Sequence, residues 1–185
     1  METTINKLPE NTIHFFHELS EYLDTTLYFY GSVQRRDYFH GKSDIDVDIF
    51  TDNKEATMKQ LQYFLHLSKS DFKKIVWRIQ HSNKVAHGYK VMYKNPEENI
   101  TAEFSIYDER MKLDILKVHG MKIIVPFYIS WILIVLKTLY YNLNMMNKKT
   151  YRYLKMNTLN SLMGYQDEEF LIFPTFQKVE PNKLL

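Results

Sequence analysis

The clearest pattern along the chain is an alternation of aliphatic and acidic residues between positions 44 and 51. Ile45, Val47 and Ile49 occupy the odd positions, and aspartates occupy the even positions before Phe50. Because successive side chains of a β-strand point to opposite faces, this period of two predicts a strand with one apolar and one acidic face. The aspartates are Asp44, Asp46 and Asp48. Such a row of like charges is costly unless a cation neutralises it, and a divalent metal is the simplest candidate.

The remaining periodicities predict a mixture of helices and strands. Helices are expected over residues 9–23, 53–67, 109–119, 126–143 and 148–163, with a helical turn at 33–38. Further strands are expected at 27–30, 74–80, 89–93, 100–107 and 121–125. Gly164 is expected to cap the last helix, and a tail containing Pro174 and Pro181 is expected to form an irregular surface strap. The pattern predicts an α+β fold in one compact domain, a mixed β-sheet packed against helices, with a core at 1–125 and C-terminal helices and tail at 126–185.

A glycine-serine pair precedes the acidic strand. Gly31 and Ser32 follow the short apolar run at 27–30, and eleven residues separate them from Asp44. Glycine allows a tight turn and a close approach of the backbone to a phosphate, and successive amides can form an anion-binding nest. Ser32 adds a hydroxyl, so the pair predicts a phosphate-binding turn.

Gly41-Lys42-Ser43 has the ending of a P-loop. That motif requires a glycine where this chain has Arg36, and it requires a helix afterwards. The alternating strand pattern that follows excludes this interpretation.

An EF-hand calcium loop is a second alternative. The residues at loop positions 1, 3, 5, 9 and 12 are Asp44, Asp46, Asp48, Asp52 and Glu55. The sharp turn at position 6 requires glycine, and this chain has the β-branched Ile49 there, which disfavours the loop.

An apolar strand, Gly-Ser, a spacer and then Asp-x-Asp on a second strand resemble the signature of the polymerase-β-like nucleotidyltransferase superfamily. The resemblance covers positions 27–50. It implies the palm fold of that superfamily, with the triphosphate of an NTP bound by Gly31 and Ser32. It also implies two Mg²⁺ ions, or Mn²⁺, held by Asp44 and Asp46, with a third carboxylate supplied by a later strand.

Glu103 is the first candidate for the third carboxylate. It lies on the polar side of the alternating segment 100–107, where the superfamily more often has aspartate. Asp108, at the end of that segment, and Asp114 are the alternatives. By resemblance, Glu103 would also lie near the acceptor hydroxyl and could act as its general base.

The most apolar segment, residues 123–136, is too short to span a bilayer and contains Pro126 and Ser130. A turn at Gly120, a short strand at 121–125 and an apolar helix bearing Lys137 resemble an element of smaller nucleotidyltransferases. The resemblance implies that Lys137 lies near the triphosphate. The alternative is a lysine that extends along the helix to solvent.

Composition narrows the choice of function. The 185 residues are 45% hydrophobic with a net charge of +2, which does not indicate a strongly basic nucleic-acid-binding surface. The absence of cysteine excludes disulfides and cysteine-ligated zinc. Neither a secretory signal nor a membrane span is expected, so the expected location is cytoplasmic.

Two groups of basic residues accompany these motifs. Arg35, Arg36 and Lys42 flank the proposed site and could contact phosphates or an acceptor. A second group, interleaved with Tyr151 and Tyr153, comprises Lys148, Lys149, Arg152 and Lys155. That group fits either a face for RNA or another polyanion, or a solvated helix surface.

The function expected from these features is metal-dependent transfer of a nucleoside monophosphate from an NTP to a hydroxyl acceptor, with release of pyrophosphate. The acceptor is open among a small molecule, an RNA end, a nucleotide and a protein side chain. The alternative is a catalytically inactive relative that binds a nucleotide or a partner protein.

Overall fold

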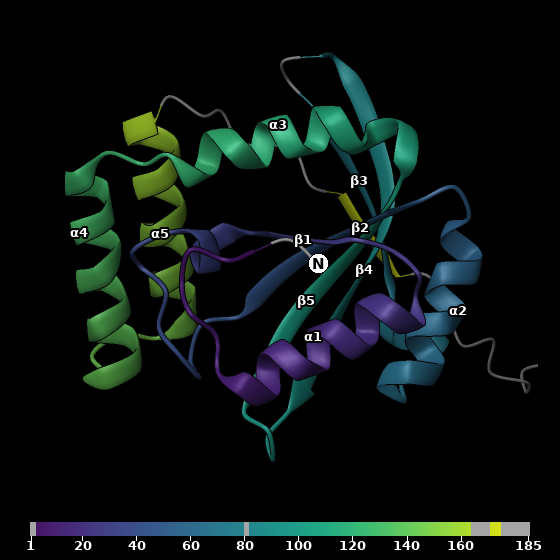
Figure 1. The fold of residues 1–185 in the computed structure, drawn as a ribbon. Coiled ribbons are helices and arrows are strands. Elements are labelled where there is room, and N and C mark those ends of the chain that lie inside the picture. Colours follow the sequence, from purple (N-terminus) through teal and green to yellow (C-terminus); the bar gives the residue numbers. More distant parts are fainter. Residues whose placement is uncertain (1–2, 80–81, 164–170, 175–185) are drawn as a thin grey trace, which may run out of the picture.

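The computed structural model describes residues 3–79, 82–163 and 171–174, and within them one mixed β-sheet forms the centre of the fold (Figure 1). Its strand order is β1-β2-β5-β4-β3-β6. The strands are β1 (Leu27–Tyr30), β2 (Ile45–Thr51), β3 (Lys73–Ile79), β4 (Lys84–Asn95), β5 (Ile100–Asp108) and β6 (Leu171–Pro174). The helices are α1 (Glu10–Tyr22), α2 (Lys54–Leu65), α3 (Lys112–Ile123), α4 (Phe127–Lys137) and α5 (Lys148–Met163). The α+β class expected from the sequence is therefore confirmed.

The alternation in β2 separates two hydrophobic clusters. Ile45, Val47 and Ile49 are buried in the cluster that contains Phe16 of α1 and Leu61 of α2. The other cluster joins residues of the sheet to α3 and contains Phe50, Trp77, Tyr107, Ile115 and Val118. The apolar face of β2 therefore packs on α1 and α2, and its acidic face lies on the side of α3.

The pairing of β2 with β5 positions the acidic residues. These two strands are parallel, and Asp46 is the Cα partner of Glu103. The other strand pairs of the sheet are antiparallel. Because both residues occupy the same face of neighbouring strands, their side chains lie beside each other.

Helices α4 and α5 pack against each other at one end of the molecule (Figure 1). Between them, the π-helical segment η4 (Thr138–Asn142) extends α4 by one irregular turn. Among the described helices, none alone is long and apolar enough to cross a membrane. Residues Glu109–Ile123 and Phe127–Asn142 meet the length and composition requirements only together, across a bend of 84°.

Most predicted elements are present within a few residues of their expected bounds. β1 and α5 have the predicted bounds, and β4 is longer than expected. Asn53 caps α2 by accepting a hydrogen bond from the amide of Ala56. The turn expected at 33–38 is instead the 3₁₀ turn η1 (Gly31–Gln34), directly after β1.

The strand predicted at 121–125 is wrong. Residues up to Ile123 continue α3, so Gly120 is inside a helix and forms no turn. A short apolar run fits a buried strand or a helix end equally well, and only its neighbours decide between them. Helix α4 begins after Pro126 as expected.

The prediction for the tail is wrong in part. Leu171–Pro174 pair with β3 at the sheet edge and are not irregular. A proline is tolerated there because an edge strand leaves some of its amides unpaired. The expectations for Gly164 and Pro181 fall outside the described residues.

Candidate active site

One cavity of about 260 Å³ brings together five of the six site residues predicted from the sequence. These are Ser32, Asp44, Asp46, Glu103 and Lys137. They come from segments that are up to about a hundred residues apart in the sequence, namely η1, the start of β2, β5 and α4. The other lining residues are Ser43, Met92, Tyr140, Tyr141, Lys148, Tyr151, Arg152 and Lys155.

The sixth predicted residue, Gly31, supports this cavity with its backbone. It begins η1 with φ of +70°, a conformation that glycine adopts without strain. A Cβ atom on residue 31 would lie 2.0 Å from Oδ2 of Asp46. The missing side chain therefore leaves room for the carboxylate, and Ser32 follows it in a buried position.

Two of the carboxyl groups in the cavity, those of Asp44 and Asp46, have a raised pKa. Burial and the nearby charge of Glu103 raise the pKa of Asp46 from 3.8 to about 6. The same two causes raise the pKa of Asp44. Lys155 opposes both shifts. Crowded and desolvated carboxylates of this kind fit a divalent cation, because a cation would offset both the cost of burying their charge and the repulsion between them.

Glu103 also forms an ion pair. Lys90 Nζ donates to Glu103 Oε1 at 2.7 Å. Within the described part of the chain, no three His, Asp or Glu side chains are already grouped as a metal site. Because Glu103 already pairs with Lys90, binding of a metal would require the Glu103 carboxylate to exchange Lys90 for the ion.

The two alternatives for the third carboxylate lie elsewhere. Asp108 binds the exposed Arg110 and lines a different cavity. Asp114 binds Lys84, with 2.6 Å between Oδ2 and Nζ. Of the three acidic residues considered, Glu103 is the one in the cavity with Asp44 and Asp46.

Lys137 is buried, so the alternative of a lysine extending to solvent is wrong. Its side chain is only 2% exposed. Nζ donates to the carbonyl of Asp37 at 2.5 Å and to Ser43 Oγ at 3.1 Å, and it lies 3.1 Å from Asp37 Oδ2. Burial lowers its pKa to about 8, although Asp37 acts in the opposite direction. Lys137 thus attaches α4 to the segment between η1 and β2, at the wall of the cavity.

Two of the basic residues that flank the predicted site, Arg35 and Lys42, also join segments of the fold. Arg35 is buried and pairs with Asp37, with 2.8 Å between Nε and Oδ1. Lys42 donates to Asn142 Oδ1 at 2.6 Å. These contacts secure the loop before β2 and do not extend a cation into the cavity.

Basic and aromatic residues from η4 and α5 form another part of the cavity lining. Lys148, Arg152 and Lys155 follow helical spacing and present one face of α5 to the cavity. The rings of Tyr140 and Tyr151 stack at 4.4 Å with an interplanar angle of 4°. Three of the four members of the second basic group therefore line the same cavity as the acidic residues, and the fourth, Lys149, is a solvated residue.

The third aspartate of β2 has a separate environment. Asp48 is fully buried, and its Oδ2 lies 2.7 Å from Nδ1 of His119. The two atoms are close, but their geometry is not that of a hydrogen bond, and neither has a hydrogen-bond partner among the described residues. The ring of Tyr30 stacks on His119 at 4.0 Å. The close approach of Asp48 to His119 therefore joins β2 to α3, and no local sequence pattern indicated the pairing.

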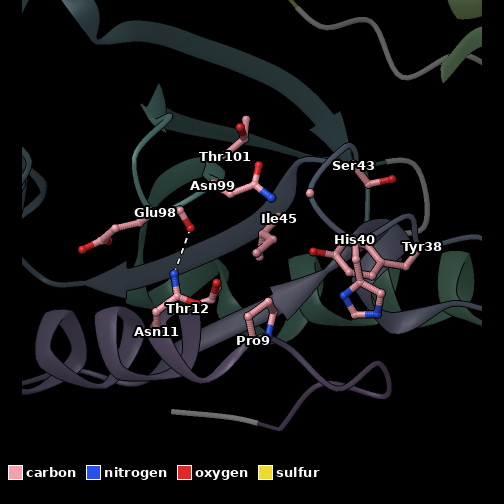
Figure 2. A pocket seen from close by; sticks show the side chains of 11 residues that line it. Pro9, Asn11, Thr12, Tyr38, His40, Ser43, Ile45, Glu98, Asn99 and Thr101 are labelled. Carbon is pink, nitrogen blue, oxygen red and sulfur yellow. Dashed lines mark hydrogen bonds between the residues drawn. The ribbon is translucent and has the colours of Figure 1, made fainter. Parts of the chain in front are cut away.

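A second cavity, of about 230 Å³, lies next to the first and shares Ser43 with it (Figure 2). Asn11 donates to the carbonyl of Glu98 across it. The side chains of Asn99, His40 and Thr101 also line it. None of the predicted site residues lines this cavity, and its composition does not indicate phosphate or metal chemistry.

Comparisons of the chain with known protein families, with characterised proteins and with solved structures found no match. The case for a function therefore rests on the side chains of the first cavity.

Proposed function

We propose that the protein is a metal-dependent nucleotidyltransferase with the polymerase-β-like palm fold. It transfers a nucleoside monophosphate from an NTP to a hydroxyl acceptor and releases pyrophosphate. One observation carries the proposal: Asp46 and Glu103 are neighbours on the parallel strands β2 and β5, and the Gly31-Ser32 turn lies against Asp46. A phosphate-sized turn beside paired carboxylates is the arrangement required for metal-assisted phosphoryl chemistry.

The residues that would hold two Mg²⁺ or Mn²⁺ ions are Asp44, Asp46 and Glu103. When bound, such ions neutralise phosphate charge and stabilise the attacking and leaving oxygens of an in-line displacement. The raised pKa values of Asp44 and Asp46 support this assignment, since burial and the nearby charge of Glu103 both disfavour the ionised carboxylates until a cation neutralises them.

The triphosphate would lie between the η1 turn and α5. The backbone amides of Gly31 and Ser32 offer donors on one side. Lys148, Arg152 and Lys155 supply cations on the other side. Two divalent ions and these three side chains together offset three carboxylates and an ionised triphosphate, so the cavity is close to neutral when loaded.

The aromatic residues of the same wall suit the nucleoside. Tyr140, Tyr141 and Tyr151 contact one another and line the cavity. An aromatic face can stack on any base, which provides affinity without strong base selection.

In the transfer step, the acceptor oxygen forms a bond to the α-phosphorus as the bond to the bridging oxygen of pyrophosphate breaks. Glu103 takes the acceptor proton, and pyrophosphate leaves with the bonding electron pair. The protein mainly positions the reactants and offsets charge, as phosphoryl transfer requires.

The second candidate function is binding of a nucleotide without chemistry. The ion pair between Lys90 and Glu103 favours it, because this contact occupies the carboxylate that the reaction requires. In this case the cavity would bind NTP and release it unchanged.

A labelling experiment separates the two functions. Purified protein is incubated with Mg²⁺, each α-labelled NTP and RNA, protein or small hydroxylated acceptors. Transfer of label that is lost in Asp46→Asn, and retained in the matched control Asp108→Asn outside the cavity, would support the transferase. Metal-dependent NTP binding measured by calorimetry, with no transfer to any acceptor, would support the binding protein.

A further inference from the structure

Helix α4 is apolar on every side, yet only one side is packed against the protein. Ile129, Leu133 and Leu136 are buried on its inner face. Its outer side, continued by Ile124, exposes six apolar or aromatic residues, namely Ile124, Phe127, Tyr128, Trp131, Ile132 and Val135. We call these six residues the α4 face. Helices that are hydrophobic all round are normally buried, so the α4 face is expected to be covered in the native assembly.

The size of the α4 face matches one half of a stable protein interface. Ile124 is 84% exposed, Phe127 64% and Trp131 53%. Exposures of this size correspond to roughly 700 Å² of surface for the six residues, close to the ~800 Å² that each partner buries in a standard interface. Scattered surface residues of a monomer do not form a continuous patch of this size.

The lack of exposed charge on α4 indicates which kind of partner covers the α4 face. Helix α4 has one charged residue, Lys137, and its ammonium group is buried against Asp37. An uncharged face can meet its own copy without like-charge repulsion, as an interface around a two-fold axis requires. Helices that lie in a membrane surface carry cations beside their apolar face, and α4 offers no exposed cation for that role.

We infer that the α4 face is the homodimer interface of this chain, with two copies of α4 packed antiparallel around a two-fold axis. Trp131 lies near the middle of the helix, and its ring meets that of Phe127 edge to face at 5.9 Å. Aromatic residues at the centre of an interface supply most of its binding energy. The interface is separate from the cavity, so this inference is independent of the proposed activity.

The first test measures the mass of the 185-residue chain in solution by sedimentation equilibrium. We expect a species of twice the 22.4 kDa chain mass at micromolar concentration. Trp131→Glu is expected to weaken association by about a hundredfold. Tyr63→Glu is the matched control, since Tyr63 is 75% exposed on α2, away from α4, and it should leave the mass unchanged.

The second test requires no disruptive substitution. The chain has no cysteine, so Ile132→Cys introduces a single thiol on the α4 face. Mild oxidation should link two copies efficiently, whereas Tyr63→Cys should not be linked beyond random collision.

Three outcomes would overturn the inference. One is a wild-type chain that stays monomeric up to about 100 µM, where an interface of this size should associate. Another is a monomer that binds vesicles of phosphatidylcholine and phosphatidylglycerol through the α4 face, as shown by loss of binding in Trp131→Glu. The third is a monomer in which deletion of residues 175–185 unmasks the α4 face to an apolar dye, since a segment of the same chain would then be its cover.

Discussion

Gly31 lies so close to the carboxylate of Asp46 that a Cβ atom on residue 31 would come within 2.0 Å of Oδ2. The turn proposed to bind phosphate and the carboxylate proposed to bind metal are thus in direct contact. A change in either one displaces the other, and this coupling gives the first prediction.

Gly31→Ala should disrupt the site more than the fold. Alanine at φ of +70° costs about 1–2 kcal/mol, and its methyl group would displace the Asp46 carboxylate. We expect at least a tenfold loss of metal-dependent NTP affinity in calorimetry. Gly120→Ala is the matched control, because Gly120 lies inside α3 with open space around it. That variant should bind NTP normally and be stabilised by about 0.5–1 kcal/mol. Equal NTP binding by both variants would contradict the role given to the turn.

Asp46→Asn should stabilise the metal-free protein at neutral pH. The pKa of Asp46 is raised in the folded state, so the folded state holds this proton more tightly than the unfolded state does. The stabilising contribution is therefore present below about pH 4 and is lost as the pH rises through about 6. Removal of the charge should recover up to about 2 kcal/mol at pH 7, discounted for partial exposure.

Thermal melts with and without Mg²⁺ test this prediction. Mg²⁺ should raise the melting temperature of the wild type and have little effect on Asp46→Asn. A variant less stable than the wild type at pH 7 in EDTA would show that Asp46 is not electrostatically strained.

His119→Ala should destabilise the fold strongly. The substitution removes a buried ring that stacks on Tyr30 and is the nearest polar neighbour of the buried Asp48 carboxylate, and loss of such a polar partner typically costs about 1–3 kcal/mol. Urea unfolding provides the measurement. In the double variant Asp48→Asn/His119→Ala the loss should be smaller than the sum of the two single losses, because the two side chains interact. Strict additivity would mean that the pair contributes nothing as a pair.

Lys155→Met should weaken NTP binding and raise the pKa of Asp46 further. Lys155 lines the cavity and lowers the pKa of that carboxyl, so its removal takes away an attraction that stabilises the ionised carboxylate. We expect a five- to tenfold increase in the dissociation constant for NTP, about 1–1.4 kcal/mol. Lys149→Met removes an exposed charge from the same helix without altering the lining of the cavity, and it should change binding less than twofold at physiological salt. Equal effects of the two substitutions would indicate a general effect of net charge.

The sequence predicted the parts of the site that depend on local patterns. Alternation located Asp46 and Glu103 on strands, and a period of two fixes which face each side chain occupies. Gly31 was recognisable because glycine directly after a short apolar strand indicates a tight turn. In each case the physical reason acts over a few residues, and the structure places these side chains where the pattern indicated.

The remaining features depend on contacts between distant segments. No local pattern links Lys137 to Asp37, a hundred residues away, or His119 to Asp48. The choice between a solvated and a functional face for α5 also required the position of that helix relative to β2. The error at 121–125 has the same origin, since the neighbours of the apolar run made its first part the end of α3.

The acidic and basic residues that line the cavity are synthesised at different times, because they lie far apart in the sequence. The carboxylates of β2 leave the ribosome about a hundred residues before the cations of α5. Until then the carboxylates lack the opposing charge of Lys155, which lowers the pKa of Asp44 and Asp46 in the folded chain. The cavity is therefore completed only when α5 is synthesised and docks, because four of its lining residues, Lys148, Tyr151, Arg152 and Lys155, belong to that helix.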